Sequence, residues 1–336
     1  MLAGSPAGMD YWFSASHEMF PPSEALAQAQ AAAEAGFDGI GGSDHFAPWW
    51  PEGQSGNAWV WLGAVGQAVP RLPIGTGVTA LVHRYHPAVV AQAFMSLEEL
   101  FPGRVFLGAG SGEALNEVAC GADWPAVGEQ IERMDQALDV ISRLWDGETV
   151  TADHGWFKVK DCKLYTRAKS RPKIYVSAFG EQAAGVAANR GDGVWTLGDP
   201  ESTPGVVDAY RSAGGDGEVI VHAGFAWADD DDKLIDGVRP WRATVPDEFY
   251  VDDWHDPAKM QDHSAQQVSD DDLRESFVIS TEPEEHVEKV REREQLGATV
   301  VCLQNMSGAD PMGTIRIYKD EVLPSLRRIH ASASQT

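Results

Sequence analysis

The sequence predicts an α/β fold, a (β/α)8 TIM barrel with insertions, in a single domain that spans residues 1–336. Three observations lead to this prediction. The chain has 336 residues, which suits a barrel of this class because such barrels typically need about 250 residues plus insertions. Short apolar runs alternate with helical patterns, which is typical of a parallel sheet. About eight strand candidates occur, and this number favours a closed barrel over an open sheet.

The strands and helices are expected in regular alternation. The first strand candidate, residues 11–16, is followed by an Ala-rich helix with Ser23 as its N-cap and Gly36 at its end. The other strand candidates are residues 37–42, 74–81, 105–108, 174–177, 219–226 and 298–303. Further helices are expected over residues 87–100, 126–145 and 317–329.

Two segments interrupt this alternation. Residues 147–173 include Trp156 and Phe157 and predict a β-rich excursion from the barrel. Residues 227–272 are crowded with Asp and predict an acidic insert within the barrel, either a lid or a helical layer. A solvated surface is the alternative explanation for the Asp runs.

The charge of the chain narrows the classes of partner. Asp and Glu total 51 against 26 Lys and Arg, which gives a net charge of -25. Such a surface repels nucleic acid and anionic membranes, so we expect neither as a partner. It also keeps a protein soluble where salt screens self-repulsion. The hypothesis is a halophilic, high-salt cytoplasm, and the alternative is an ordinary acidic protein.

The chain also lacks the patterns of secreted, membrane and metal proteins. Its three cysteines, Cys120, Cys162 and Cys302, have no CxxC spacing, which argues against a disulfide framework or a zinc site. The first residues lack a basic start and a long apolar run, and no apolar stretch reaches the length of a membrane span. We therefore expect a soluble, cytoplasmic protein without a metal.

Polar residues follow the first two strand candidates, at the end of a barrel where active sites form. Glu18 follows the first strand, and Asp44 and His45 follow the second. Histidine titrates near neutral pH and suits the removal of a proton from an alcohol. Trp49 offers a flat face to a ring or a cation. A solvated glutamate and a structural histidine are the alternatives.

Glycine-rich segments end the next strand candidates. Residues 108–116 have the pattern GxGxGE, which lets backbone amides approach a ligand but matches neither the dinucleotide fingerprint nor the P-loop. Glu113 then offers an acid at the barrel mouth, or alternatively a carboxylate favoured by a helix N-terminus. Glycines in residues 75–80 indicate a bulge or a close ligand. Residues 177–180 run into a helix N-terminus that suits phosphate, or form a plain turn.

Taken in order, these segments resemble a known family. The motifs are SDHFAPW at 43–49, RYHPAVVAQAF at 84–94, GRVFLGAGSGEALNE at 103–117 and IYVSAFG at 174–180. They resemble the deazaflavin-dependent branch of the luciferase-like superfamily, and within it the F420-dependent glucose-6-phosphate dehydrogenase family. The resemblance covers residues 11–200 and resumes over 276–328. It implies coenzyme F420 as cofactor, with FMN as the alternative, and a homodimer.

The resemblance also implies roles for individual residues. His45 is expected as the active-site base and Glu113 as the acid toward the deazaflavin ring, with Glu18 and Trp49 beside the substrate. A non-proline cis peptide is expected at Gly77-Val78. The cofactor-binding residues implied are Asp44, Gly77, Val78, Ala80, Ser111, Gly112, Asn116, Ser177, Ala178, Phe179 and Gly180.

The substrate is expected to differ from a sugar phosphate. Asp199 and Ser276 stand where the resembling family has basic residues that hold a phosphate. Arg274 and Lys259 are the candidate substrate-binding residues that remain. We therefore expect a dehydrogenase that takes hydride from an unphosphorylated alcohol or sugar. The alternatives are a sugar-phosphate dehydrogenase and an FMN-dependent luciferase-like monooxygenase.

Overall fold

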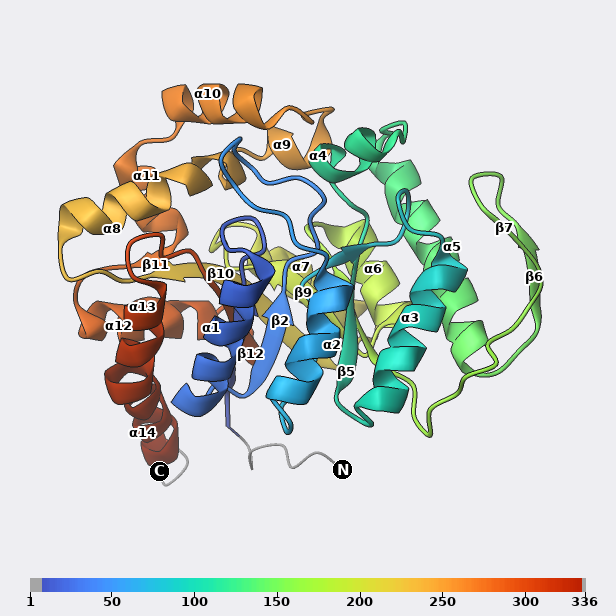
Figure 1. Cartoon of the computed structure of the whole chain (residues 1–336), viewed down its shortest axis with the longest axis horizontal. Coiled ribbons are helices and arrows are strands. Elements are labelled where there is room, and N and C mark those ends of the chain that lie inside the picture. Colours follow the sequence, from blue (N-terminus) through green and yellow to red (C-terminus); the bar gives the residue numbers. More distant parts are fainter. Residues whose placement is uncertain (1–7, 334–336) are drawn as a thin grey trace.

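The computed structural model describes residues 8–333, and within them eight parallel strands close into a barrel (Figure 1). Round the barrel the strands follow the order β12, β1, β2, β3, β5, β8, β9 and β10, and β10 pairs back onto β12. Their bounds are β1 Asp10–Ala15, β2 Gly39–Gly42, β3 Ile74–Thr76, β5 Val105–Gly110, β8 Lys173–Ser177, β9 Gly193–Leu197, β10 Glu218–Ala226 and β12 Val300–Asn305. The predicted fold class is confirmed.

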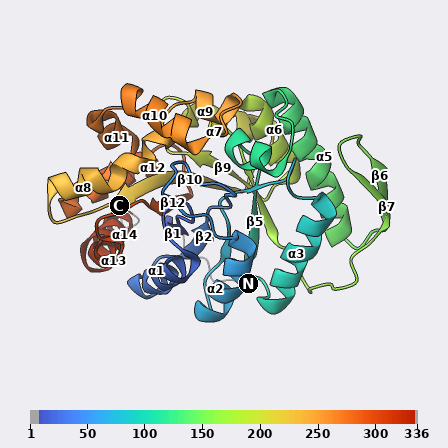
Figure 2. The same cartoon turned by 45° about the horizontal axis from the view of Figure 1, so that its top comes forward.

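Helices follow the strands and surround the barrel (Figure 2). Their bounds are α1 Pro22–Ala35, α2 Ala58–Ala68, α3 Pro87–Leu100, α4 Ala114–Glu117, η1 Val118–Cys120, α5 Val127–Trp145, α6 Glu181–Arg190, α7 Thr203–Ser212, α12 Pro283–Glu294, α13 Pro311–Ile317, the π-helical turn η3 Tyr318–Val322 and α14 Leu323–Ala333. The apolar faces of these helices and the outward faces of the strands form the main core. Within residues 8–333, no helix is both long enough and apolar enough to cross a membrane.

Several predicted boundaries are corrected by the structure. Helix α1 begins at Pro22, whose fixed φ suits the first helical position, so Ser23 lies inside the helix and is not its N-cap. Gly36 does end this helix, with φ +96°. The closing helix begins at Pro311, before the predicted residue 317. The prediction omits helix α2, which contains Gly63 and Gly66 and so has a weak helical pattern.

The predicted run over residues 74–81 is split in two, at the position where the sequence indicated a bulge. After β3, the short strand β4 (Thr79–Ala80) pairs with β5. The peptide bond between Gly77 and Val78, which separates β3 from β4, is cis, as the resemblance implied.

The two interrupting segments lie outside the barrel (Figure 1). Strands β6 (Val150–Asp153) and β7 (Lys158–Cys162) form an antiparallel hairpin within residues 147–173. The segment 227–272 is helical, and its elements continue to residue 279. Their bounds are α8 Asp231–Val238, η2 Arg239–Thr244, α9 Glu248–Val251, α10 Pro257–Gln267, α11 Asp270–Ser276 and the strand β11 Val278–Ile279. This layer has its own apolar cluster, which includes Trp49 and Trp50.

The barrel interior is closed at one end and polar at the other. A cluster of buried, mostly large side chains fills the interior on the side of the strands' amino ends. Its members are Trp12, Phe106, Tyr175, Trp195, Ile220, Val300 and Cys302. Side chains two residues apart on a strand share a face, so the next inward positions follow directly. They are mostly small or polar, namely Ser14, Gly108, Ser177, Leu197, His222 and Gln304. The interior therefore carries mostly small and polar residues toward the carboxyl ends of the strands.

Candidate active site

Three ionisable side chains meet where β1, β2 and β5 end. Nε2 of His45 lies 3.4 Å from Oε1 of Glu18 and 3.4 Å from Oε2 of Glu113. With Asn116 these residues form what we call the His45 cluster. Each comes from the segment that follows a strand, as the sequence predicts. An imidazole beside two carboxylates can hold and move a proton.

Glu18 is held in place beneath His45. Its side chain is almost fully buried, and the hydroxyl of Ser43 donates a hydrogen bond of 2.5 Å to Oε2. The backbone N–H of His17 donates to the same hydroxyl oxygen at 3.1 Å, which fixes the orientation of Ser43. Oε1 of Glu18 is therefore the oxygen that faces His45.

Glu113 occupies the N-cap position of the short helix α4, in extended conformation. About a fifth of its side chain remains exposed, at 21%. Burial raises the pKa of Glu113, and the neighbouring Glu18 raises it further, while His45, Arg84 and the amide of Asn116 oppose the rise. Glu113 is thus a carboxyl that keeps a proton to higher pH than an ordinary glutamate, as an acid in this position requires.

Asn116 connects the cluster to the loop that carries His45. Its Oδ1 accepts hydrogen bonds from the backbone N–H groups of Phe46 and Ala47, at 2.8 and 3.2 Å. Its Nδ2 donates to Oε2 of Glu113 at 3.0 Å and lies 3.3 Å from Nδ1 of His45. The side chain that the resemblance assigned to the cofactor is therefore fully engaged with protein groups.

A buried ion-pair network stands beside the cluster, and sequence reasoning missed it. The guanidinium of Arg84 lies 3.0 Å from Oδ1 of Asp44 and 3.1 Å from Oε1 of Glu117. Asp44 also accepts from the hydroxyls of Thr79, at 2.7 Å, and Tyr85, at 3.2 Å. Asp44, predicted as a cofactor contact, thus anchors the loops after β2 and β4. Arg84 and Tyr85 begin the motif RYHPAVVAQAF, which was the available signal.

Aromatic rings line one side of the cluster. The ring centroid of Trp49 lies 5.4 Å from that of His45 and 5.5 Å from that of Tyr250. Phe179 approaches Tyr250 edge to face at 6.0 Å and is 52% exposed. Tyr250 comes from α9 in the helical layer, so this layer contributes to the candidate site. The sequence showed aromatic residues in the insert but gave no means of placing one of them.

The glycine-containing segments around Gly77 and Gly110 form a second part of the candidate site, which we call the glycine wall. Gly77 and Val78 are partly exposed, although Thr76 and Thr79 on either side are buried. A Cβ at Gly110 would lie 2.7 Å from Cγ2 of Val78, so a side chain has no room there. Gly110 is therefore needed for packing against Val78, and the partly exposed backbone at Gly77 and Val78 is the part of this wall that a ligand could reach.

The remaining predicted cofactor residues lie around this wall. Ala80 is buried against Gly112, which has φ +94°, and Ser111 is half-buried. Ser177 is half-buried and Ala178 is buried, ahead of α6. Phe179 and Gly180 are exposed, Gly180 is the N-cap residue, and no side chain caps this helix.

Polar atoms without hydrogen-bond partners lie inside the barrel, toward the carboxyl ends of the strands. Nε2 of His222 and Oε1 of Gln304 are 3.0 Å apart. Among the described residues, Nδ1 of His222 and Oγ of Ser14 are buried and have no hydrogen-bond partner. Buried polar groups in proteins are nearly always hydrogen-bonded, so these atoms indicate a position where a ligand or ordered water completes the site.

The two predicted substrate-binding cations lie apart from the cluster. Arg274 makes two hydrogen bonds of 2.8 Å to Asp231, and Lys259 is an exposed residue of α10 near Asp256. No contact in the described part of the chain joins either of them to His45. They are therefore not brought into the candidate site.

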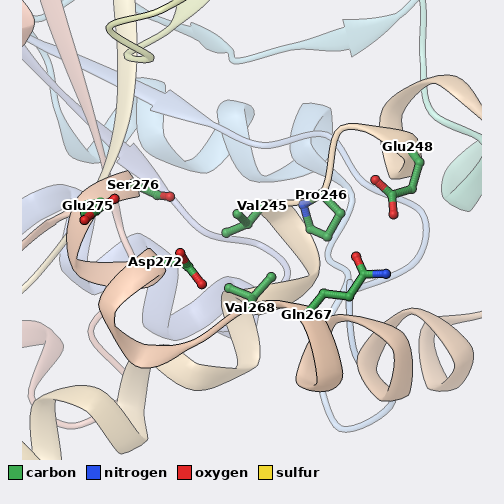
Figure 3. Close-up of a pocket in the computed structure, with 8 residues that line it drawn as sticks. All are labelled: Val245, Pro246, Glu248, Gln267, Val268, Asp272, Glu275 and Ser276. Atoms are coloured by element: carbon green, nitrogen blue, oxygen red, sulfur yellow. The ribbon is translucent and has the colours of Figure 1, made fainter.

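A pocket of about 310 Å³ opens in the helical layer beside Ser276 (Figure 3). The carboxylates of Glu248, Asp272 and Glu275 line it, together with Val245, Pro246, Gln267 and Val268. No Lys or Arg is among these lining residues. Glu248 belongs to α9, which also supplies Tyr250. The described residues contain no group of three or more His, Cys, Asp or Glu side chains arranged to hold a metal.

Comparison with known proteins gives consistent relatives. The family model described as luciferase-like monooxygenase matches residues 6–300. The F420-dependent glucose-6-phosphate dehydrogenase of Microbacterium testaceum is 36% identical over 332 residues, which cover 95% of this chain and 97% of that protein. The F420-dependent hydroxymycolic acid dehydrogenase of Mycobacterium tuberculosis is 34% identical, with 96% and 89% covered.

A solved structure is similar over nearly the whole length. It is an F420-dependent secondary alcohol dehydrogenase in complex with an F420-acetone adduct. The TM-score is 0.89 and the sequence identity is 31%, with 95% of this chain and 99% of that chain covered. A tetrahydromethanopterin reductase that depends on coenzyme F420, from Methanopyrus kandleri, shares the fold at 18% identity and a TM-score of 0.77.

Proposed function

Because this chain belongs to the luciferase-like monooxygenase family, and relatives 36% and 34% identical to it are F420-dependent dehydrogenases, we propose that it is an F420-dependent dehydrogenase acting on a hydroxyl group. The observation that carries the proposal is the His45 cluster at the carboxyl ends of β1, β2 and β5. It provides what the oxidation of an alcohol requires from a protein, namely a polar group at the reacting oxygen and a place for the proton.

The residues present fit a deazaflavin. The partly exposed backbone at Gly77-Val78 suits the flat face of a ring. The uncapped N-terminus of α6 offers free N–H groups to a phosphate. Inside the barrel, the buried atoms Nδ1 of His222 and Oγ of Ser14 have no hydrogen-bond partner in the protein, so they could bond to a ligand. When bound, this cofactor supplies a two-electron acceptor for hydride that reacts poorly with oxygen.

The protein's own part in the reaction is to place the hydroxyl and handle its proton. His45 lies at the centre of the cluster, where its Nε2 can contact the reacting oxygen between Glu18 and Glu113. Glu18 is held ready by Ser43 to share or receive the hydroxyl proton. Glu113, with its raised pKa, keeps a proton on the other side. The rings of Trp49 and Tyr250 supply an apolar side to this position.

The proposed substrate class is an unphosphorylated alcohol or sugar. A bound phosphate is usually matched by Arg or Lys. In this chain Asp199 and Ser276 occupy the expected basic positions, and Arg274 is already paired with Asp231. The pocket beside Ser276 is lined by three carboxylates. These features support a neutral substrate. The homodimer and the high-salt cytoplasm remain predictions.

The experiment is reduction of coenzyme F420, followed by its absorbance, with glucose 6-phosphate, glucose, and primary and secondary alcohols as substrates. We expect turnover with a neutral alcohol or sugar and little with glucose 6-phosphate. His45→Gln should lower kcat by roughly 100-fold or more, whereas His154→Gln, on the remote hairpin, is the matched control and should leave it unchanged. Efficient turnover of glucose 6-phosphate would refute the substrate class, and oxygen uptake with FMN instead of F420 reduction would refute the cofactor.

A further inference from the structure

Nδ1 of His45 faces a hydrogen-bond donor whose orientation is fixed. Oδ1 of Asn116 accepts from the backbone N–H groups of Phe46 and Ala47. If the amide were turned over, its NH2 group would face these two N–H donors, and Oδ1 would face the carboxylate of Glu113. The contact between the NH2 group and the two N–H donors would be repulsive, because neither side could accept a hydrogen bond. The orientation with Nδ2 toward His45 is therefore the one that satisfies all partners.

We propose that Asn116 is a positioning residue that keeps neutral His45 in the tautomer with its proton on Nε2. Nδ2 of Asn116 carries two hydrogens, so it can donate two hydrogen bonds and accept no hydrogen bond. One hydrogen is directed to Oε2 of Glu113, at 3.0 Å, and the other to Nδ1 of His45, at 3.3 Å. Nδ1 must then be the acceptor, so the ring proton lies on Nε2.

This tautomer determines where a proton can go. The Nε2–H of His45 points between Oε1 of Glu18 and Oε2 of Glu113, and it can donate to the oxygen of a substrate. Nδ1 is occupied by Asn116 and closed to the substrate. A bound deazaflavin would supply the acceptor for the C–H hydrogen as hydride with its electron pair, and Oε1 of Glu18 would then take the O–H proton as the C=O bond forms. His45 donates to the oxygen throughout, so this proposal gives the role of base to Glu18 and not to His45, for which the resemblance implied it.

The inference rests on the proposed function only for its catalytic consequence. The tautomer itself can be measured without cofactor or substrate, by ¹⁵N NMR of protein labelled at histidine. The signals of His45 are assigned by their loss in His45→Gln. In the wild-type protein we expect a protonated Nε2 and an unprotonated Nδ1. A protonated Nδ1 would overturn the proposal, whatever the activity of the enzyme.

Asn116→Asp replaces the N–H donor that faces Nδ1 of His45 with a carboxylate oxygen, which is an acceptor. Its carboxylate can still accept from Phe46 and Ala47 but now accepts from Nδ1 of His45 as well. We expect the proton to move to Nδ1, with a kcat at least roughly 100-fold lower, a smaller change in KM and an altered pH profile of kcat. Unchanged His45 signals would contradict the proposal.

A matched control and a second variant keep the test decisive. Asn57→Asp makes the same change at the N-cap of α2, where Oδ1 of Asn57 accepts from the N–H of Val60 at 3.0 Å. It should leave the His45 signals and kcat unchanged. If Asn116→Asp does not fold, Asn116→Leu removes the donor without adding a charge, and a mixture of the two tautomers is expected. A pure Nε2–H tautomer in Asn116→Leu would show that Asn116 does not determine it.

Discussion

The buried network of Arg84, Asp44 and Glu117 predicts an unusual pH dependence of stability. One guanidinium faces two carboxylates, and the side chain of Glu117 is fully buried. Burial raises the pKa of Glu117 from 4.5 to about 7, against the attraction of Arg84. The folded protein therefore retains a proton on Glu117 over a pH range in which the unfolded chain has lost it.

The sign and size of the effect follow from linkage. Because the folded pKa is raised, the stabilising contribution of this proton is fully present below about pH 4.5 and is lost as the pH rises through about 7. A shift of about 2.5 units at about 1.4 kcal/mol each corresponds to about 3 kcal/mol. Glu117→Gln removes this titration. The wild-type protein should thus lose about 3 kcal/mol relative to Glu117→Gln across that range.

Urea unfolding, followed by tryptophan fluorescence, measures the difference at a series of pH values between about 4.5 and 8. The lost hydrogen bond in Glu117→Gln adds an offset that does not depend on pH, so the change of the difference with pH is the decisive quantity. Glu99→Gln, an exposed change on α3, is the control and should give parallel curves. Parallel curves for Glu117→Gln would refute a raised pKa at this position.

Three further predictions test other parts of the structure. Gly110→Ala should weaken F420 binding more than it lowers stability, because its Cβ would displace Val78, and isothermal titration together with urea unfolding separates the two effects. Ser276→Arg should lower the KM for glucose 6-phosphate, since it places a basic residue where the resembling family has one for the phosphate, and an unchanged ratio of activities with glucose 6-phosphate and glucose would contradict this. Because the net charge is -25, thermal stability should rise with KCl concentration through screening, and a melting temperature independent of salt would refute the halophilic hypothesis.

The parts of the candidate site that could be predicted are the residues that directly follow a strand. Glu18, His45 and Glu113 each follow a strand, and parallel barrel strands bring their carboxyl ends together, so their proximity follows from the fold. The network of Arg84 was not predictable from its spacing, since its partners come from two other segments, Asp44 from the loop after β2 and Glu117 from α4. A residue type in a loop does not reveal which distant loop it will contact.

The helical layer shows the same limit more clearly. Its Asp-rich sequence predicted an insert over the barrel but could not place Tyr250 against Trp49, because that contact depends on how the layer packs as a whole. The positions of Arg274 and Lys259 depend on the same packing. The sequence offered them as cations near the substrate, and the structure pairs the first with Asp231 and leaves the second exposed.

The segment after β5 explains why a short motif can be so informative. Gly112 has φ +94°, a conformation that favours glycine, and it turns the chain so that α4 starts at once. Residues three and four positions apart lie on neighbouring parts of a helical turn. Glu113 and Asn116 therefore both reach His45, while Glu117 reaches Arg84. One turn of helix thus connects the candidate proton-handling groups to the buried network that fixes the adjoining loops, so a change in its conformation would disturb both together.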